Sequence, residues 1–256
     1  MRLDKYLAEH GFSSRTKAAR ALSKGLVRVN GKIGKASDDV TEKDDIFVES
    51  EKTQFVSEGG YKLYKAFSDF GVDVKGCVFA DIGASTGGFT DCLLQSGAAF
   101  VYCVDVGKSQ LSAELAQDER VCVMDGVNAR YLQDRDFPRQ IDGMTADVSF
   151  ISLTLIIPAL ARILTKGKRA FLLIKPQFEC EGKGQDKHGI VKDEGERIAA
   201  VQRVYECAVK ENFSVKGITN APLHKNKNIE YVLFLEKEGE CGLCETEVLE
   251  RARKLT

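Results

Sequence analysis

From about residue 75 onward, apolar runs of strand length alternate with amphipathic runs of helix length, and this alternation restricts the possible folds most. Parallel strands buried on both faces appear as continuous apolar runs, and the helices between them cover the sheet. The sequence therefore predicts an α/β fold with a Rossmann-like, mainly parallel sheet covered on both faces. Strands are expected at 77–82, 100–105, 120–124, 142–147, 169–175, 213–218 and 230–236, and helices at 60–70, 88–96, 109–116, 152–164 and 194–211.

The first fifty residues have a different pattern, with short apolar repeats and a turn signal. Asn30-Gly31 between two apolar runs is typical of a tight hairpin. A small α+β domain is therefore predicted ahead of the larger one. Its helices are expected at 2–10 and 15–24, the second capped by Ser13 or Ser14, its hairpin at 26–32 and its last strand at 46–48. The predicted parts are a domain over 1–50, a linker over 51–58, a domain over 59–238 and a charged tail over 239–256 with a final helix.

Charge is unevenly distributed, although the whole chain carries only −1. Residues 1–36 hold nine Lys/Arg and two Asp/Glu, so this segment carries +7 and the remainder −8. A basic segment suggests an anionic partner, although a solvated basic face would account for the same charge. The eight scattered cysteines do not resemble a disulfide framework, no apolar signal segment opens the sequence, and the apolar run 150–164 is too short to span a bilayer. We therefore expect a cytoplasmic protein with reduced thiols and no membrane contact.

The segment 78–90 is the strongest local signal for a ligand site. An apolar strand ends in Asp81, a glycine-rich turn follows, and a helix begins, while the next strand ends in Asp105. This is the place where open α/β sheets bind nucleotides, and an acid ending the second strand can bind ribose hydroxyls. No Gly-Lys-Ser/Thr follows, which disfavours a P-loop, and G-x-x-x-G-G departs from the dinucleotide pattern. Asp81 before the turn instead suits S-adenosylmethionine, with its cationic amino-acid end, although an ordinary tight turn would also explain the glycines.

Four polar residues at strand or helix edges are candidates for catalysis: Lys62, Asp147, Lys175 and Glu230. Lys175 ends the apolar run 170–174, and an unpaired ammonium is costly to bury. A structural ion pair between Lys175 and Asp147 or Glu230 would account for this as well as a catalytic role. Taken one at a time, the four residues do not decide between these readings.

Taken together, the glycine-rich turn and the four polar residues resemble the FtsJ/RrmJ-type ribose 2′-O-methyltransferases. The segment from Arg2-Leu3-Asp4-Lys5-Tyr6-Leu7 to Val29-Asn30-Gly31-Lys32 resembles the RNA-binding domain first seen in ribosomal protein S-four. The two in this order resemble the TlyA-type rRNA methyltransferases, also labelled haemolysin A-like, to about residue 236. Where the family has Ser-Arg-Gly-Gly, this chain has Ser57-Glu58-Gly59-Gly60, a reversal of charge at Glu58.

The resemblance implies S-adenosylmethionine as cofactor, ribosomal RNA or ribosomal subunits as partner, and a Lys-Asp-Lys-Glu tetrad on Lys62, Asp147, Lys175 and Glu230. We expect Lys175 to act as general base toward the ribose hydroxyl, oriented by Asp147, while Lys62 and Glu230 orient the hydroxyl. The candidate cofactor-binding residues are Asp81, Gly83, Ser85, Thr86, Gly87, Gly88, Phe89, Asp105, Val106, Asp125, Asn128 and Asp147. The candidate RNA-binding residues are Arg2, Lys5, Arg15, Lys17, Arg20, Lys24, Arg28 and Lys32.

Some alternatives stay open at this point. The segment 179–194 is either a loop that closes over the target nucleotide or a mobile surface loop. Cys241 and Cys244 form a single C-x-x-C without further ligands, so no metal site is predicted. Competing functions are an RNA-binding assembly factor with an inactive transferase domain, a membrane-active haemolysin and a small-molecule dehydrogenase, which would leave residues 1–50 unexplained.

Overall fold

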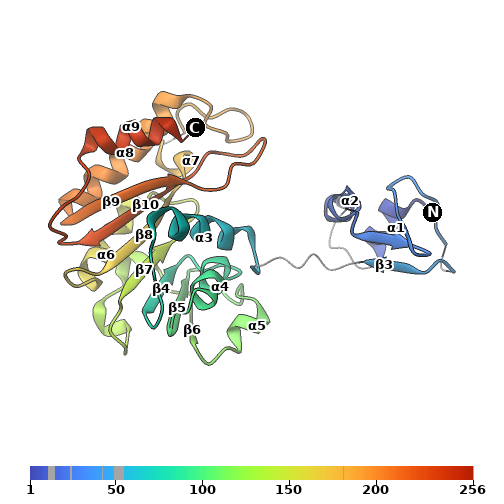
Figure 1. Cartoon of the computed structure of the whole chain (residues 1–256), viewed down its shortest axis with the longest axis horizontal. Helices are drawn as coiled ribbons and strands as arrows, with labels where there is room; N and C mark the ends of the chain where they lie inside the picture. Colours follow the sequence, from blue (N-terminus) through green and yellow to red (C-terminus); the bar gives the residue numbers. More distant parts are fainter. Residues whose placement is uncertain (11–14, 24, 42, 49–54, 181, 256) are drawn as a thin grey trace. The chain divides into compact units, whose positions relative to one another are not determined.

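In the computed structural model the chain divides into two compact units, Met1–Gln54 and Phe55–Thr256. Figure 1 shows the elements of both units in sequence colours. The structure describes residues 1–10, 15–23, 25–41, 43–48, 55–180 and 182–255, without the side chains of 15–17 and 20.

The small unit packs two helices against a three-stranded antiparallel sheet of order β2-β1-β3. Asn30 at the β1–β2 turn has a left-handed backbone, φ 49°, as the Asn-Gly signal predicts. Leu3, Leu7, Leu22 and Val27 lie in its core, so the apolar repeats face inward as expected. Ser13 and Ser14, the predicted cap, lie outside the described residues. The elements are α1 (Leu3–Glu9), α2 (Arg15–Ser23), β1 (Val27–Val29), β2 (Lys32–Ile33) and β3 (Ile46–Val48).

The large unit contains a seven-stranded sheet of order β6-β5-β4-β7-β8-β10-β9. The first five strands in this order are parallel, and β10 runs antiparallel to both of its neighbours. The predicted mainly parallel α/β sheet is therefore confirmed. Its strands are β4 (Val78–Ile82), β5 (Phe100–Asp105), β6 (Val121–Asp125), β7 (Gly143–Ala146), β8 (Arg169–Ile174), β9 (Phe213–Asn220) and β10 (Tyr231–Lys237).

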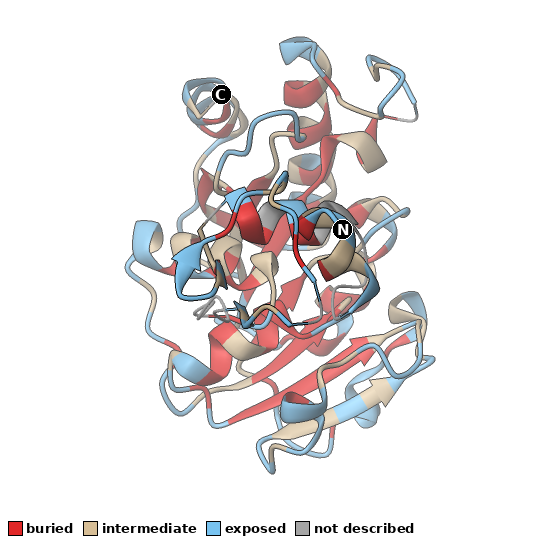
Figure 2. Cartoon of the chain, turned by 90° about the vertical axis from the view of Figure 1, so that its right-hand side faces the viewer, coloured by how far each residue is buried: buried red, intermediate tan, exposed pale blue. Residues whose placement is uncertain are grey.

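Helices cover both faces of this sheet. Along β8, Leu172 and Ile174 belong to one apolar core, whereas Phe171 and Leu173 belong to another, because successive side chains of a strand point to opposite faces. Figure 2 shows most strands of this sheet as buried ribbon, whereas the edge strand β6 is only partly buried. The first core includes residues of α6 (Ile157–Ile163), α8 (Glu194–Lys210) and α9 (Glu245–Lys254), and the second includes residues of α3 (Glu58–Phe70), α4 (Gly88–Gln95) and α5 (Ala113–Ala116).

Two helices differ from the sequence prediction. The one expected at 109–116 is reduced to α5, because Ser112 caps a helix that begins only at Ala113. The one expected at 152–164 divides into a 3₁₀ turn at Leu153–Leu155 and α6, because Pro158 lacks an amide hydrogen and fits only the first turn of a helix. Across the described ranges, every helix is too short or too polar to cross a membrane.

Candidate active site

The carboxyl ends of β4, β5, β7 and β8 meet at one edge of the sheet, where the chain order reverses on either side of β4. The glycine-rich turn lies at this reversal and approaches the end of β7 closely. Gly83 has φ +79°, and a Cβ there would lie 2.6 Å from the carbonyl oxygen of Asp147. Gly87 has φ +95°, and its Cβ would lie 2.4 Å from Leu115 Cδ1. Both positions thus require glycine, which keeps the turn open toward a ligand.

Asp81 differs from the sequence expectation, because its side chain is fully buried and lines neither of the two cavities described below. Its carboxylate accepts hydrogen bonds from the hydroxyls of Thr90 (2.7 Å) and Thr145 (2.8 Å). Burial raises the pKa of Asp81 to about 6, although these hydrogen bonds act in the opposite direction. Asp81 therefore joins β4 to α4 and β7 from beneath the turn, and its direct contact with a cofactor is not supported.

A smaller cavity of about 390 Å³ lies between the ends of β5, β6 and β7. Asp105 faces it, and its carboxylate oxygens accept the backbone amides of Ser85 (2.8 Å) and Gly107 (2.7 Å). Each carboxylate oxygen has a second lone pair, so the two can still accept the vicinal hydroxyls of a ribose. Val106 is 74% exposed at the wall and offers an apolar surface to a base. The cavity thus suits a nucleoside.

The other predicted cofactor residues divide into three groups. Asp125 accepts the backbone amide of Ser109 (2.7 Å) and does not line the smaller cavity, so it differs from the expectation. Gly87 shapes the turn without lining either cavity. The smaller cavity is lined by Gly83, Ser85, Asp105, Val106, Asn128 and Asp147, and the larger cavity described next by Thr86, Gly88 and Phe89.

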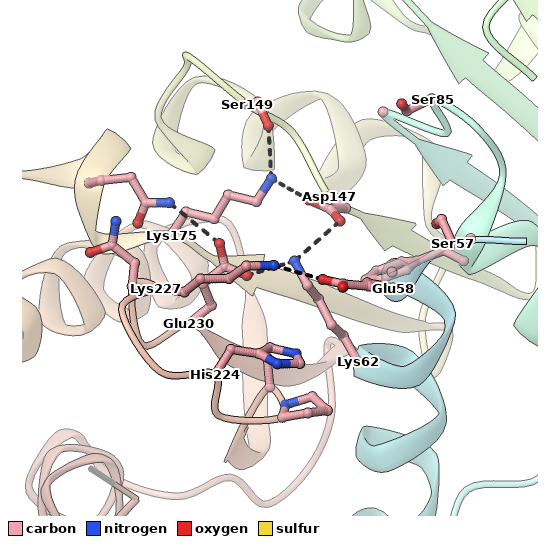
Figure 3. Close-up of a pocket in the computed structure, with 18 of the residues that line it drawn as sticks. Ser57, Glu58, Lys62, Ser85, Asp147, Ser149, Lys175, His224, Lys227 and Glu230 are labelled. Atoms are coloured by element: carbon pink, nitrogen blue, oxygen red, sulfur yellow. Dashed lines mark hydrogen bonds and ion pairs between the residues drawn. The ribbon is translucent and has the colours of Figure 1, made fainter. Parts of the chain in front are cut away.

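A larger cavity of about 1160 Å³ adjoins the smaller one and contains the predicted tetrad. Lys175 Nζ lies 2.5 Å from Asp147 Oδ1, and Lys62 Nζ lies 4.0 Å from Asp147 Oδ2 and 2.6 Å from Glu230 Oε2. Figure 3 shows Asp147 between the two lysines. The four side chains come from α3 and from the ends of β7, β8 and the β9–β10 connection. They form a row of alternating charges with no net charge, so none of these partly buried groups is left unpaired.

The two lysines have different surroundings. Burial alone would lower the pKa of Lys62, but the charges of Asp147 and Glu230 outweigh it and raise that pKa, so Lys62 stays protonated. Lys175 is only 8% exposed and, besides its contact with Asp147, donates a hydrogen bond to Ser149 Oγ (2.8 Å). Lys62 is therefore suited to a fixed cation that orients a substrate oxygen, and Lys175 points at the boundary shared by the two cavities.

Ser149 and Phe150 were not among the sequence candidates. Both lie within three residues after Asp147 and line the smaller cavity. Phe150 is 92% exposed, has a left-handed backbone (φ 61°), and places its ring 5.0 Å from that of Phe178. An exposed aromatic ring in a strained conformation at a site edge is typical of a surface for stacking. The only sequence signal was that these residues come shortly after Asp147, which follows the last residue of β7.

Within the segment 179–194, expected as either a closing loop or a mobile one, residues 182–193 are held by specific hydrogen bonds. Asp186 Oδ1 accepts the backbone amides of His188 (2.8 Å) and Ile190 (3.1 Å), while Lys192 Nζ lies 3.0 Å from Asp186 Oδ2. These contacts lower the pKa of Asp186 to about 2. Asn228 joins the segment to the β9–β10 connection by accepting the amide of Val191 (2.8 Å). The two segments together form one wall of the larger cavity.

The candidate RNA-binding residues whose side chains the structure describes contact only near neighbours in the chain or are exposed. Arg2 Nε lies 3.1 Å from Asp4, Lys5 Nζ lies 3.9 Å from Glu9, and Arg28 donates weakly to the carbonyl of Gly31 (3.4 Å). Lys32 is exposed on β2. Arg15, Lys17 and Arg20 belong to α2, but their side chains are outside the described part of the chain, as is Lys24.

Comparisons with known proteins agree with this arrangement. The family of FtsJ-like methyltransferases matches residues 55–237, and the S4 domain matches residues 1–46. A Bacillus subtilis protein provisionally named rRNA methyltransferase YqxC is 41% identical over 93% of this chain and 86% of its own. The 16S/23S rRNA (cytidine-2′-O)-methyltransferase TlyA of Mycobacterium tuberculosis is 37% identical over 94% of this chain and 92% of its own. A solved structure from Streptococcus thermophilus, provisionally titled a haemolysin, is 40% identical. It superposes with a TM-score of 0.76 and covers 99% of this chain and 96% of its own.

Proposed function

Because the chain belongs to the FtsJ-like methyltransferase family, we propose that it methylates a ribose 2′-oxygen of ribosomal RNA, with S-adenosylmethionine as methyl donor. The observation that carries this proposal is the position of Asp147. It lines both cavities and lies between the two lysines of the tetrad. A cofactor in the smaller cavity and a ribose in the larger one would therefore meet at Asp147.

The smaller cavity fits S-adenosylmethionine in chemistry as well as in size. Asp105 would accept the two ribose hydroxyls, and Val106 would contact the adenine face. The open side of the glycine-rich turn, at Gly83 and Ser85, would adjoin the amino-acid end. When bound, this cofactor supplies an electrophilic methyl group.

The tetrad would prepare the 2′-hydroxyl for transfer. A protonated hydroxyl is a poor nucleophile, so a base must remove its proton as the new bond forms. Lys175, in its neutral form, would take this proton, and its contacts with Asp147 and Ser149 would fix the direction of its lone pair. Lys62, which stays cationic, would stabilise the developing negative charge on the oxygen, with Glu230 holding Lys62 in place.

The target nucleotide is proposed to be a cytidine, the nucleoside in the printed name of the TlyA relative. A ribose that reaches a buried tetrad must leave its base stack, and the exposed ring of Phe150 offers a surface on which that base can stack. The lost stacking would thus be partly replaced within the site.

The RNA backbone would pass along the wall made by the segment 182–193 and the β9–β10 connection. Both carry cationic or imidazole side chains, whereas the glycine-rich turn on the opposite side has no lysine or arginine among residues 83–90. Phosphate contacts of this kind position RNA without reading its sequence. The S4 domain would add further phosphate contacts, and a ribosomal substrate would place the protein in the cytoplasm. On this side the larger cavity is lined by His188, Lys192 and His224, and the two segments also carry Lys183, Lys187 and Lys225.

Transfer of radiolabelled methyl tests this proposal. The full-length protein is incubated with labelled S-adenosylmethionine and ribosomal subunits from a strain that lacks it, and the RNA is then digested to nucleosides. We expect the label in 2′-O-methylcytidine. Label in a base-methylated nucleoside, or no label on subunits or naked rRNA despite measurable cofactor binding, would overturn the proposed chemistry.

A further inference from the structure

Two ion pairs connect α3 with the end of the β9–β10 connection. The inner pair joins Lys62 Nζ to Glu230 Oε2 at 2.6 Å, and the outer pair joins Lys227 Nζ to Glu58 Oε2 at 2.7 Å. Glu58 lies one helical turn before Lys62, and Lys227 lies three residues before Glu230, so the two pairs are adjacent, as Figure 3 shows. Both pairs line the larger cavity.

The two pairs have opposite polarity. The helix contributes the cation to the inner pair and the anion to the outer pair. A shift of α3 by one turn would place Glu58 against Glu230 in one direction, or Lys62 against Lys227 in the other, and like-charge repulsion disfavours both. The two pairs together therefore define the register of the helix against the connection, as well as their separation.

The outer pair is too exposed to stabilise the fold much. The side chains of Lys227 and Glu58 are 58% and 40% exposed, against 22% and 15% for Lys62 and Glu230. Exposed pairs are screened by salt and have little effect on folding. On its other side the connection is attached by Asn228 to Val191. The outer pair is thus a second attachment of this connection to α3, besides the inner pair, and it acts by positioning the connection.

We propose that Glu58 and Lys227 are positioning residues that fix the separation and register of Lys62 and Glu230, and thereby the site of the target ribose. This inference rests on the proposed function of the tetrad. It also gives a role to Glu58, where the resemblance leads one to expect arginine. In agreement, the charge of Glu58 is among those that raise the pKa of Lys62.

Neutralising and exchanging the pair tests this inference. At saturating RNA and cofactor, we expect kcat to fall about three- to tenfold in Glu58→Gln and in Lys227→Gln. The KM for RNA, the Kd for S-adenosylmethionine and Tm should not change. The exchanged protein, Glu58→Lys with Lys227→Glu, should recover at least half of the loss on a logarithmic scale. As a control, Glu236→Gln removes the carboxylate of an ion pair between β9 and β10, with Lys216 (3.4 Å), which does not line the cavity, and should leave kcat unchanged.

Hydrogen exchange on the full-length protein gives a readout independent of activity. Amides of residues 224–229 should exchange severalfold faster in Glu58→Gln, and the exchanged pair should restore protection. The inference would be overturned if neither the hydrogen exchange of these amides nor kcat changes. It would also be overturned if Lys227→Gln raises the KM for RNA without changing kcat, and the charge-swapped protein does not recover. That result would make Lys227 a phosphate ligand. If the wild type transfers no methyl to RNA, the proposed function fails, and the exchange data alone decide whether the pair positions this segment.

Discussion

The two cavities of the candidate site are built in different ways. The smaller one is lined by residues at or after the ends of successive strands, from Ile82 to Ile156. The larger one gathers side chains from segments as far apart as Ser57 and Glu230, and its tetrad is held by ion pairs. The first is therefore suited to holding a ligand, and the second to placing charges around a reacting group. A change in one should alter binding, and a change in the other should alter turnover.

The largest expected effect is on turnover and comes from Lys62→Met. This change leaves Asp147 and Glu230 facing one another without the cation between them and removes the charge that would stabilise the 2′-oxygen. We expect kcat to fall at least about a thousandfold, or about 4 kcal/mol in the barrier. Steady-state methyl transfer at saturating substrates measures this, and a loss below tenfold would contradict the division between the cavities.

The next effect, in stability, comes from Asp81 beneath the turn. Its pKa is raised to about 6, so its contribution to stability is fully present below about pH 4 and is lost as pH rises through about 6. The size of the shift corresponds to about 3 kcal/mol. Asp81→Asn should remove this dependence. The wild type should therefore lose stability relative to the variant between pH 4 and pH 7.5 in denaturant unfolding, and parallel pH profiles would refute the assignment.

Asp105→Ala should affect cofactor binding. The carboxylate would accept two ribose hydroxyls, and charge-assisted hydrogen bonds of this kind contribute about 2 kcal/mol or more. Calorimetry should give a Kd for S-adenosylmethionine raised at least about thirtyfold, with kcat at saturating cofactor within about threefold of wild type. Asp125→Asn is the matched control, because Asp125 ends the neighbouring strand but does not line the cavity. An equal effect of both variants would remove the basis for choosing Asp105.

The smallest effect is expected at Phe150, which lies in the lining of the smaller cavity. Its side chain is 92% exposed, so Phe150→Ala should leave Tm unchanged. Loss of one base-stacking contact corresponds to about 1 kcal/mol, so kcat/KM for RNA should fall about fivefold. Phe150→Trp should retain activity, since it preserves the ring face. If the alanine variant keeps the wild-type kcat/KM, stacking on this ring is excluded.

The same difference between the cavities explains what the sequence could predict. Asp105 and the glycine-rich turn follow from local order along the chain, because strand ends in a parallel sheet meet at one edge. The tetrad followed from a family resemblance rather than from spacing, since Lys62 and Glu230 are 168 residues apart. Asp81 has the same local pattern as a ligand-binding acid. One of its buried hydrogen bonds comes from Thr145 on β7, which is 64 residues away in the sequence and therefore gives no local signal. The exposure of Phe150 could not be predicted, because Phe150 opens the apolar run 150–164, most of which was expected to form a buried helix.

The central claim is that Lys175 serves the chemistry and not the binding of the cofactor. The most direct test is single-turnover methyl transfer to ribosomal subunits by Lys175→Met, together with the Kd for S-adenosylmethionine of the same preparation. We predict a Kd within about twofold of wild type and a rate reduced at least about a thousandfold. A rate within tenfold of wild type, or a loss that weakened cofactor binding fully explains, would contradict the claim.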